Sequence, residues 1–182
     1  ALTPSQFASG MLWQPITRLF LHSEFGHLAG NLFVLWMFGG TVALTWGTRR
    51  FLWLFLGGGA LGGVIQGLGT LLLAWLGLPL AALFVHQPSL GASGAVYTVM
   101  TVYALANSRR QVSLLFVPLA FEARWLIPIV VGLELGFPAP GVSHAAHLLG
   151  VAIGWLAVRV WGPHGDRRVG PARPAPPPRL RL

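Results

Sequence analysis

The sequence predicts an all-α protein, a polytopic transmembrane bundle with about five spans. Of its 182 residues, 54% are hydrophobic and only 9% are charged, whereas an average soluble domain carries about 25% charged residues. Apolar blocks, several near the length of about 20 residues that crosses a bilayer as a helix, alternate with short segments that contain Gly, Pro or Arg. The composition therefore excludes a water-soluble domain and a disordered chain, and it predicts that the lipid bilayer surrounds the protein.

The order of the elements follows from these blocks. Residues 1–26 are too polar to cross a bilayer, and we expect them to form a segment on the outer face that precedes the first span present. The spans are expected at roughly 27–46, 51–76, 91–107, 125–135 and 143–161. Residues 111–123 are apolar but contain Pro118 and Glu122, so we expect them at the membrane interface. The Pro- and Arg-rich residues 162–182 predict a disordered tail after a core of residues 27–161.

The distribution of charge predicts the orientation. All twelve basic residues are arginine and the net charge is +8. If the spans alternate in direction, only Arg18 lies on one side of the membrane and the other eleven arginines lie on the opposite side. Because basic residues are enriched on the cytoplasmic side, the side with eleven arginines and the tail are expected in the cytoplasm. Arginines grouped between apolar blocks indicate topology rather than a nucleic-acid partner, so we expect no nucleic acid to bind. A bacterial cytoplasmic membrane is the expected location.

With this topology, three spans begin at the non-cytoplasmic face, and each carries polar side chains in its first turns. They are His27 and Asn31, Ser93, and His144 and His147. Polar residues at membrane depth are costly, so their presence indicates a functional site. The absence of cysteine excludes thiol chemistry and cysteine-bound metals.

Ser93 lies in the segment G-A-S-G-A, where small residues allow neighbouring helices to approach. The N-terminus of a helix also offers free N–H groups to a developing oxyanion. Taken alone, a serine in such a helix start is more often a helix N-cap than a nucleophile. His147 shares a helix face with Gly150 and Gly154, which directs its imidazole into the bundle, where it could serve as general base for Ser93. From spacing alone, His144 remains an alternative.

His27 and Asn31 lie one turn apart on one helix face, and both can donate hydrogen bonds to an oxyanion. The alternatives are hydrogen bonds between helices and a zinc site built from the histidines. A metal is disfavoured because no H-E-x-x-H motif and no acid paired with the histidines on a helix is present. None of the four acidic residues is obviously placed to orient His147, so a serine hydrolase here would use a Ser–His dyad.

Four segments together resemble the rhomboid family of intramembrane serine proteases, over roughly residues 13–161. They are W-Q-P-I-T-R-L-F-L-H-S-E-F-G-H-L-A-G-N (13–31), P-S-L-G-A-S-G-A-V-Y (88–97), F-E-A-R-W-L (121–126) and V-S-H-A-A-H-L-L-G-V-A-I-G (142–154). Their order and spacing also match the family. The resemblance implies a rhomboid-like core with six spans, the first of which would precede residue 1.

The resemblance also implies the site residues. Ser93, in the G-x-S-G match that includes Gly94, corresponds to the nucleophile, and His147 to the base. His27 and Asn31, with the Ser93 N–H, correspond to the oxyanion hole. The supporting residues implied are Tyr97, which packs on the catalytic imidazole, His22, in the segment before the first span, and Gly150 and Gly154, where the serine and histidine helices meet. Gln14 departs from the family, which often has arginine after the tryptophan.

The resemblance implies an endopeptidase that cleaves transmembrane protein substrates near the outer membrane face, after or beside small residues, without cofactor or metal. Helix 125–135 is the expected gate for substrate. A catalytically inactive relative that binds transmembrane clients is the alternative, although such a protein would be expected to lack Ser93 or His147. A transporter or channel is a third possibility, but polar residues would then be expected at mid-depth, where only Gln66 lies.

Overall fold

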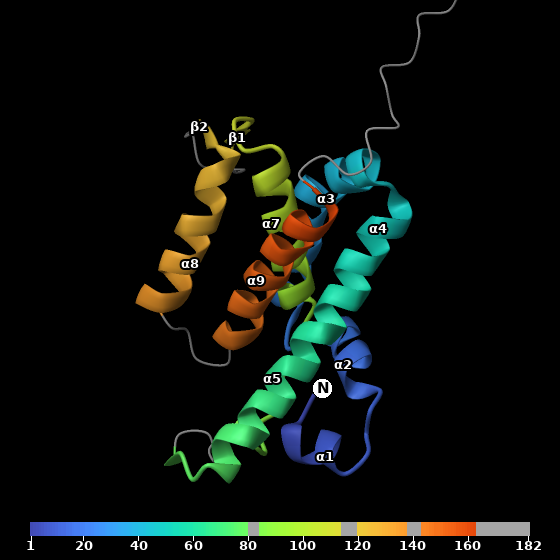
Figure 1. Ribbon diagram of the computed structural model, residues 1–182, viewed down its shortest axis with the longest axis vertical. Helices are drawn as coiled ribbons and strands as arrows, with labels where there is room; N and C mark the ends of the chain where they lie inside the picture. Colours follow the sequence, from blue (N-terminus) through green and yellow to red (C-terminus); the bar gives the residue numbers. More distant parts are fainter. Residues whose placement is uncertain (80–83, 114–119, 138–142, 163–182) are drawn as a thin grey trace, which may run out of the picture.

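Helix α7 (Ser93–Ala106) is the buried centre of a helical bundle in the computed structural model, which describes residues 1–79, 84–113, 120–137 and 143–162 (Figure 1). From Ser93 to Ala104, every residue of α7 except Tyr97 is buried. Helices α3 (Phe25–Trp46), α5 (Gly58–Trp75) and α9 (His144–Trp161) pack around it, and the contact between α7 and α9 is the most extensive. The all-α class predicted from the sequence is confirmed.

The remaining elements complete the order along the chain. The outer segment holds α1 (Pro4–Ala8), α2 (Gln14–Thr17) and the 3₁₀ turn η1 (Arg18–Phe20). Helix α4 (Thr48–Leu52) and the π-helical turn η2 (Trp53–Gly57) run without a break into α5, and η3 (Ala123–Trp125) leads into α8 (Leu126–Gly136). The helices begin and end within three residues of the predicted spans, a difference typical of helix ends.

In the part of the chain that the structure describes, three helices are long and apolar enough to cross a membrane: Phe25–Trp46, Thr48–Trp75 and His144–Trp161. Helix α7, with 14 residues, and α8, with 11, are shorter than the roughly 20 residues of a complete crossing. The sequence analysis counted both as spans. Helix α7 does not need a full apolar length because its neighbours, rather than lipid, cover most of its surface.

Small residues bring α7 and α9 together. A Cβ added at Gly150 would lie 2.2 Å from the carbonyl oxygen of Gly94, and one at Gly154 would lie 2.6 Å from that of Thr98. A Cβ added at Gly59 on α5 would lie 2.8 Å from that of Ala95 on α7. The backbones therefore approach more closely than any larger side chain would allow, as is common between membrane helices.

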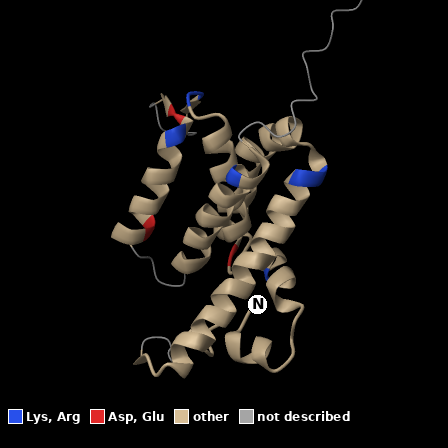
Figure 2. Ribbon diagram, in the orientation of Figure 1, with Lys and Arg blue, Asp and Glu red and all other residues tan. Residues whose placement is uncertain are grey.

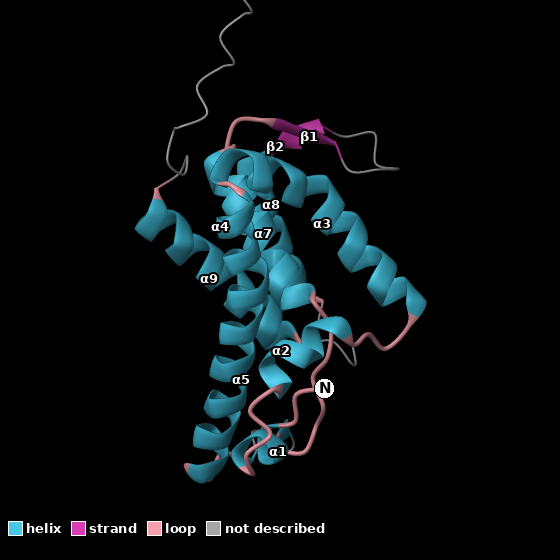
Figure 3. Ribbon diagram, turned by 90° about the vertical axis from the view of Figure 1, so that its right-hand side faces the viewer, coloured by secondary structure: helices cyan, strands magenta, loops and turns pink. Residues whose placement is uncertain are grey.

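Residues 111–123, expected as an apolar interfacial stretch, contain a small β-hairpin. Strands β1 (Gln111–Ser113) and β2 (Ala120–Glu122) pair antiparallel, with Gln111 opposite Glu122. The hairpin lies at one end of the bundle, and α1 and α2 lie towards the other (Figure 3). The all-α prediction missed these strands because three-residue strands are too short to show an alternating pattern.

The described arginines other than Arg18 lie towards one end of the bundle (Figure 2). Arg49 and Arg50 lie in α4, and Arg109 and Arg110 follow α7. Arg124 precedes α8, and Arg159 lies in the last turn of α9. The predicted tail falls outside the described residues from position 163 onward, as do its arginines. The two ends of the described part therefore differ. At the end where α7 and α9 begin, the one described arginine, Arg18, is buried, and the other described arginines lie towards the opposite end.

Candidate active site

Ser93 is the first residue of α7, at the end of the bundle opposite most of the arginines. The preceding loop turns at Gly91, whose φ of +104° is in the left-handed region that glycine adopts most readily. The backbone N–H of Gly91 donates to the carbonyl oxygen of Arg18 at 3.0 Å, which fixes the loop to the outer segment. The side chain of Ser93 lies at a helix N-terminus and is largely buried, since the residue is 9% exposed.

His147 lies in the first turn of α9 and is 8% exposed. Its imidazole stacks on the ring of Tyr97, with 4.4 Å between the ring centroids and 12° between the planes. Tyr97 follows Ser93 by four residues, one turn of α7. The stack thus places the imidazole beside the first turn of the helix that begins with Ser93. No hydrogen bond between Ser93 and His147 is present among the described residues.

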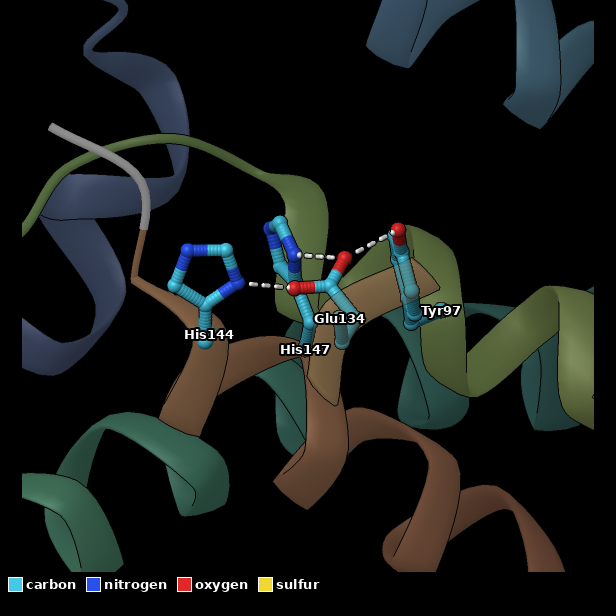
Figure 4. Close-up of polar contacts among 4 residues, drawn as sticks. All are labelled: Tyr97, Glu134, His144 and His147. Carbon is cyan, nitrogen blue, oxygen red and sulfur yellow. Dashed lines mark hydrogen bonds and ion pairs between the residues drawn. The ribbon is translucent and has the colours of Figure 1, made fainter. Parts of the chain in front are cut away.

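Glu134, near the end of α8, binds both histidines of α9 (Figure 4). The Nδ1 atom of His147 lies 2.7 Å from Oε1 of Glu134, and the Nδ1 atom of His144 lies 2.5 Å from Oε2. The hydroxyl of Tyr97 donates to Oε1 at 2.8 Å. The expectation that no acid is placed to orient His147 is therefore wrong.

The signal for Glu134 was present in the sequence. It is the acidic residue inside a predicted span, and an ionisable group at membrane depth indicates a functional contact. The partners of Glu134 could not be predicted, because the sequence of the connection between α8 and α9 (138–142) does not determine which faces of the two helices are in contact. These connecting residues lie outside the described part of the chain.

His27 and His22 approach the loop just before Ser93. A Cβ added at Gly91 would lie 2.7 Å from Cε1 of His27, so the imidazole occupies the space that any other residue at position 91 would need. The ring of His22 meets that of His27 edge-on at 5.1 Å, and the Ala92 N–H points to Nε2 of His22 at 3.5 Å. Burial, and to a lesser extent the neighbouring His27, lower the pKa of His22.

Asn31 lies one turn after His27 on α3. Its Nδ2 atom is buried and has no hydrogen-bond partner among the residues that the structure describes. Buried donors are paired in the great majority of cases, so an open one indicates a strained position or a partner that is absent from the free protein. Nδ1 of His27 lies 3.2 Å from the hydroxyl of Ser23, which leaves Nε2 on the side of Gly91.

Arg18 holds the loop before Ser93 in place through hydrogen bonds of its side chain. It is 1% exposed, and its Nη1 donates to Oε1 of Gln66 and to the hydroxyl of Ser89, each at 2.9 Å. Gln66 in turn donates to the hydroxyl of Ser143, which precedes α9, at 2.8 Å. Burial lowers the pKa of Arg18 to about 10. The sequence analysis treated Arg18 only as a topology marker and missed that it joins the outer segment, α5 and the loop before α7.

No group of three or more His, Cys, Asp or Glu side chains in the described part of the chain is arranged to hold a metal ion. Both imidazoles of α9 direct Nδ1 at the Glu134 carboxylate, and His22 and His27 face the loop at Gly91. The arrangement provides a hydroxyl at a helix N-terminus, an imidazole held by a carboxylate and an open amide donor. These are the components of an acyl-transfer site.

Comparison with known proteins identifies the family. The profile of the rhomboid domain matches residues 9–163, and this chain belongs to the rhomboid family. It is an integral membrane protein.

Several relatives are similar over most of this chain. Rhomboid protease GluP of Bacillus subtilis is 27% identical over 159 residues, which cover 87% of this chain and 28% of the relative. The mitochondrial RHOMBOID-like protein 12 of Arabidopsis thaliana is 32% identical over 164 residues, covering 84% and 48%. The human mitochondrial presenilin-associated rhomboid-like protein is 27% identical over 152 residues, covering 81% and 38%. The chain thus spans less than half the length of each of these relatives.

Proposed function

We propose that the protein is an intramembrane serine endopeptidase, with Ser93 as nucleophile and His147 as general base. The observation that carries this proposal is the stack of Tyr97 on His147, because it holds a buried imidazole beside the first turn of α7, which Ser93 begins. Membership of the rhomboid family and the similarity to a protein named a rhomboid protease support the same reaction.

The proposed reaction uses the groups already described. Oγ of Ser93 attacks the carbonyl carbon of the scissile peptide bond, and His147 accepts the hydroxyl proton. When the tetrahedral intermediate collapses, His147 returns this proton to the leaving amine, which leaves an acyl-enzyme on Ser93. Water then attacks the ester while His147 accepts a proton from it. His147 returns this proton to Oγ of Ser93 as the ester bond breaks, which releases the second product as a carboxylic acid and regenerates the serine.

The oxyanion of the intermediate needs donors that are already in place. We propose that they are the side chains of His27 and Asn31 and the backbone N–H of Ser93. The open Nδ2 of Asn31 supports this assignment because it makes no hydrogen bond that the reaction would have to break. The contact of the His27 ring with Gly91, two residues before Ser93, supports a position beside the nucleophile.

The proposed substrates are transmembrane proteins cleaved near the outer membrane face, where α7 and α9 begin. A basic side chain is not expected at the cleavage site, because the carboxylate of Glu134 is already bound by Tyr97, His144 and His147. Small residues at the cleavage site are what the resemblance to rhomboid proteases implies. Helix α8 is the proposed gate, since Leu126 is its one buried residue. We place the protein in a bacterial cytoplasmic membrane with its tail in the cytoplasm, although the relatives include mitochondrial proteins.

Labelling by a fluorophosphonate probe tests the proposal. Detergent-solubilised protein should react at Ser93, and both Ser93→Ala and His147→Ala should lose the label. Ser113→Ala is the matched control, because Ser113 lies exposed in β1 and should not affect labelling. A folded wild-type protein that does not react, or that reacts equally as Ser93→Ala, would contradict the protease assignment. It would favour the alternative, a rhomboid-like protein that binds transmembrane clients without cleaving them.

A further inference from the structure

The carboxylate of Glu134 is the meeting point of three donors from two other helices. Tyr97 of α7 and His147 of α9 both bind Oε1, and His144 of α9 binds Oε2 (Figure 4). The side chain of Glu134 is only 9% exposed, although the neighbouring Leu133 and Leu135 are exposed. A carboxylate that is largely covered on an apolar helix is costly unless its partners require it.

The pattern of hydrogen bonds determines where the protons lie. An ionised carboxylate can only accept hydrogen bonds, and its two oxygens can accept all three that are present. With Glu134 ionised, each partner must donate, and His147 would carry its proton on Nδ1. The lone pair of His147 would then be on Nε2, the nitrogen that the contact with Glu134 leaves available.

We infer that Glu134 is a positioning residue that completes a Ser93–His147–Glu134 arrangement, by holding the imidazole of His147 in the Nδ1–H tautomer. The inference rests on the proposed function, in which His147 is the base. A base needs its lone pair directed at the serine, and the imidazolium formed when it accepts the proton is stabilised by a carboxylate on the opposite nitrogen. Tyr97 and His144 hold the carboxylate itself in place.

The experiment compares Glu134→Gln, Glu134→Asp and Glu122→Gln. A glutamine at position 134 can donate its amide N–H to Nδ1, which favours the wrong tautomer, and we expect the fluorophosphonate labelling rate to fall by roughly 10³-fold. Aspartate keeps a carboxylate and should restore a substantial part of the rate. Glu122→Gln is the matched control because Glu122 pairs with Arg124 at the other end of α8, and it should label within twofold of wild type.

A second readout does not depend on reactivity. The side-chain ¹⁵N chemical shifts of histidine distinguish a proton on Nδ1 from one on Nε2, and His147→Asn identifies the signal of His147. The wild-type protein in detergent should show His147 protonated on Nδ1, and Glu134→Gln should move the proton to Nε2. A merely structural role for Glu134 would leave the tautomer unchanged in the fraction that folds.

The outcomes separate the two proposals. If wild type labels at Ser93 but Glu134→Gln, with an unchanged melting temperature, labels as fast, the inference is overturned and the serine chemistry stands. If wild type does not label, the proposed function fails, and the ¹⁵N spectrum of wild type still decides the inference. A wild-type His147 that carries its proton on Nε2 overturns it even if Glu134→Gln does not fold.

Discussion

Arg18 and Asn31 are both polar residues at the outer end of the bundle, but their hydrogen bonds differ. Nη1 of Arg18 is bound by Gln66 and Ser89, whereas Nδ2 of Asn31 is buried and open. Hydrogen bonds that end within the protein hold together the segments they join, and an open donor is available to a ligand. We therefore expect substitutions at both positions to slow the reaction for different reasons: at Asn31 a donor to the substrate is lost, and at Arg18 the loop before Ser93 is released.

Asn31→Ala should lower reactivity without lowering stability. Removing one oxyanion donor should reduce the labelling rate and substrate cleavage by roughly 100-fold, while the melting temperature stays close to that of wild type because Nδ2 has no partner to lose. The matched control is Asn107→Ala, which breaks the hydrogen bond from Nδ2 to the Tyr103 carbonyl at the far end of α7. It should cost about 1 kcal/mol of stability and leave labelling unchanged. Equal labelling by Asn31→Ala and wild type would refute the oxyanion assignment.

Arg18→Met should not destabilise the protein but should slow its chemistry. Lowering the pKa of Arg18 from 12.5 to about 10 corresponds to a cost of about 3 kcal/mol for burying the charge, and methionine removes this cost while filling similar space. Ser89 and Gln66 can still bond each other, since their oxygens lie 3.5 Å apart. The loop before Ser93 loses its tether, however, and the labelling rate should fall roughly tenfold.

The measurements for Arg18 are the melting temperature and the labelling rate, with Arg49→Met as the control at an exposed arginine. Arg49→Met should change neither quantity appreciably. A large drop in the melting temperature of Arg18→Met would overturn the stability prediction, because the hydrogen bonds of Arg18 would then outweigh the cost of burying its charge.

At the scale of elements, α7 and α8 differ in how firmly they are held. Helix α7 is buried almost throughout, and its first half touches α9 at backbone distance. Helix α8 has Leu126 as its one buried residue, packs Ile127 and Val130 against the core, and contacts His147 through Glu134. The two helices therefore supply different parts of the site. Helix α7 sets a rigid position for Ser93, and α8 brings a single side chain to His147.

Gly150→Ala tests the contact between α7 and α9. The new Cβ would lie 2.2 Å from the Gly94 carbonyl oxygen, which is backbone and cannot rotate away, so the helices must separate. We expect a loss of about 3 kcal/mol in stability and a loss of labelling, because Ser93 and His147 move apart. Gly132→Ala is the matched control. Nothing lies within 4 Å of a Cβ there, and alanine should stabilise α8 by up to about 1 kcal/mol. Equal thermal unfolding of the two variants would contradict the close contact.

The sequence was sufficient for the long helices because each depends on a local property, a run of apolar residues of sufficient length. It was also sufficient to gather Ser93, His144 and His147 at one end, since alternation of the spans fixes which helix ends meet. The contact of Glu134 with His147 could not be predicted from the sequence, because it depends on the relative position of α8 and α9 in the folded protein. The hairpin was missed for a similar reason, because the pairing of Gln111 with Glu122 is a tertiary contact.

At the scale of the whole molecule, the two ends of the bundle have different chemistry. The candidate site lies where α7 and α9 begin, and the described arginines other than Arg18 lie towards the opposite end (Figure 2). The excess of arginine on one side predicts that side to be cytoplasmic. The candidate site would then face the exterior of the cell, and the proposed cleavage would occur on that side of the membrane.

Single cysteines can test this orientation, because the chain contains none of its own. Gln87 and Arg49 are both exposed, the first near the loop that leads to Ser93 and the second in the first turn of α4. In intact bacterial cells, a membrane-impermeant maleimide should label Gln87→Cys but not Arg49→Cys, and both should react once the membrane is permeabilised. Labelling of Arg49→Cys alone in intact cells would invert the topology and place the proposed cleavage on the cytoplasmic side. Labelling of both variants in intact cells would mean that the two ends do not lie on opposite sides of the bilayer.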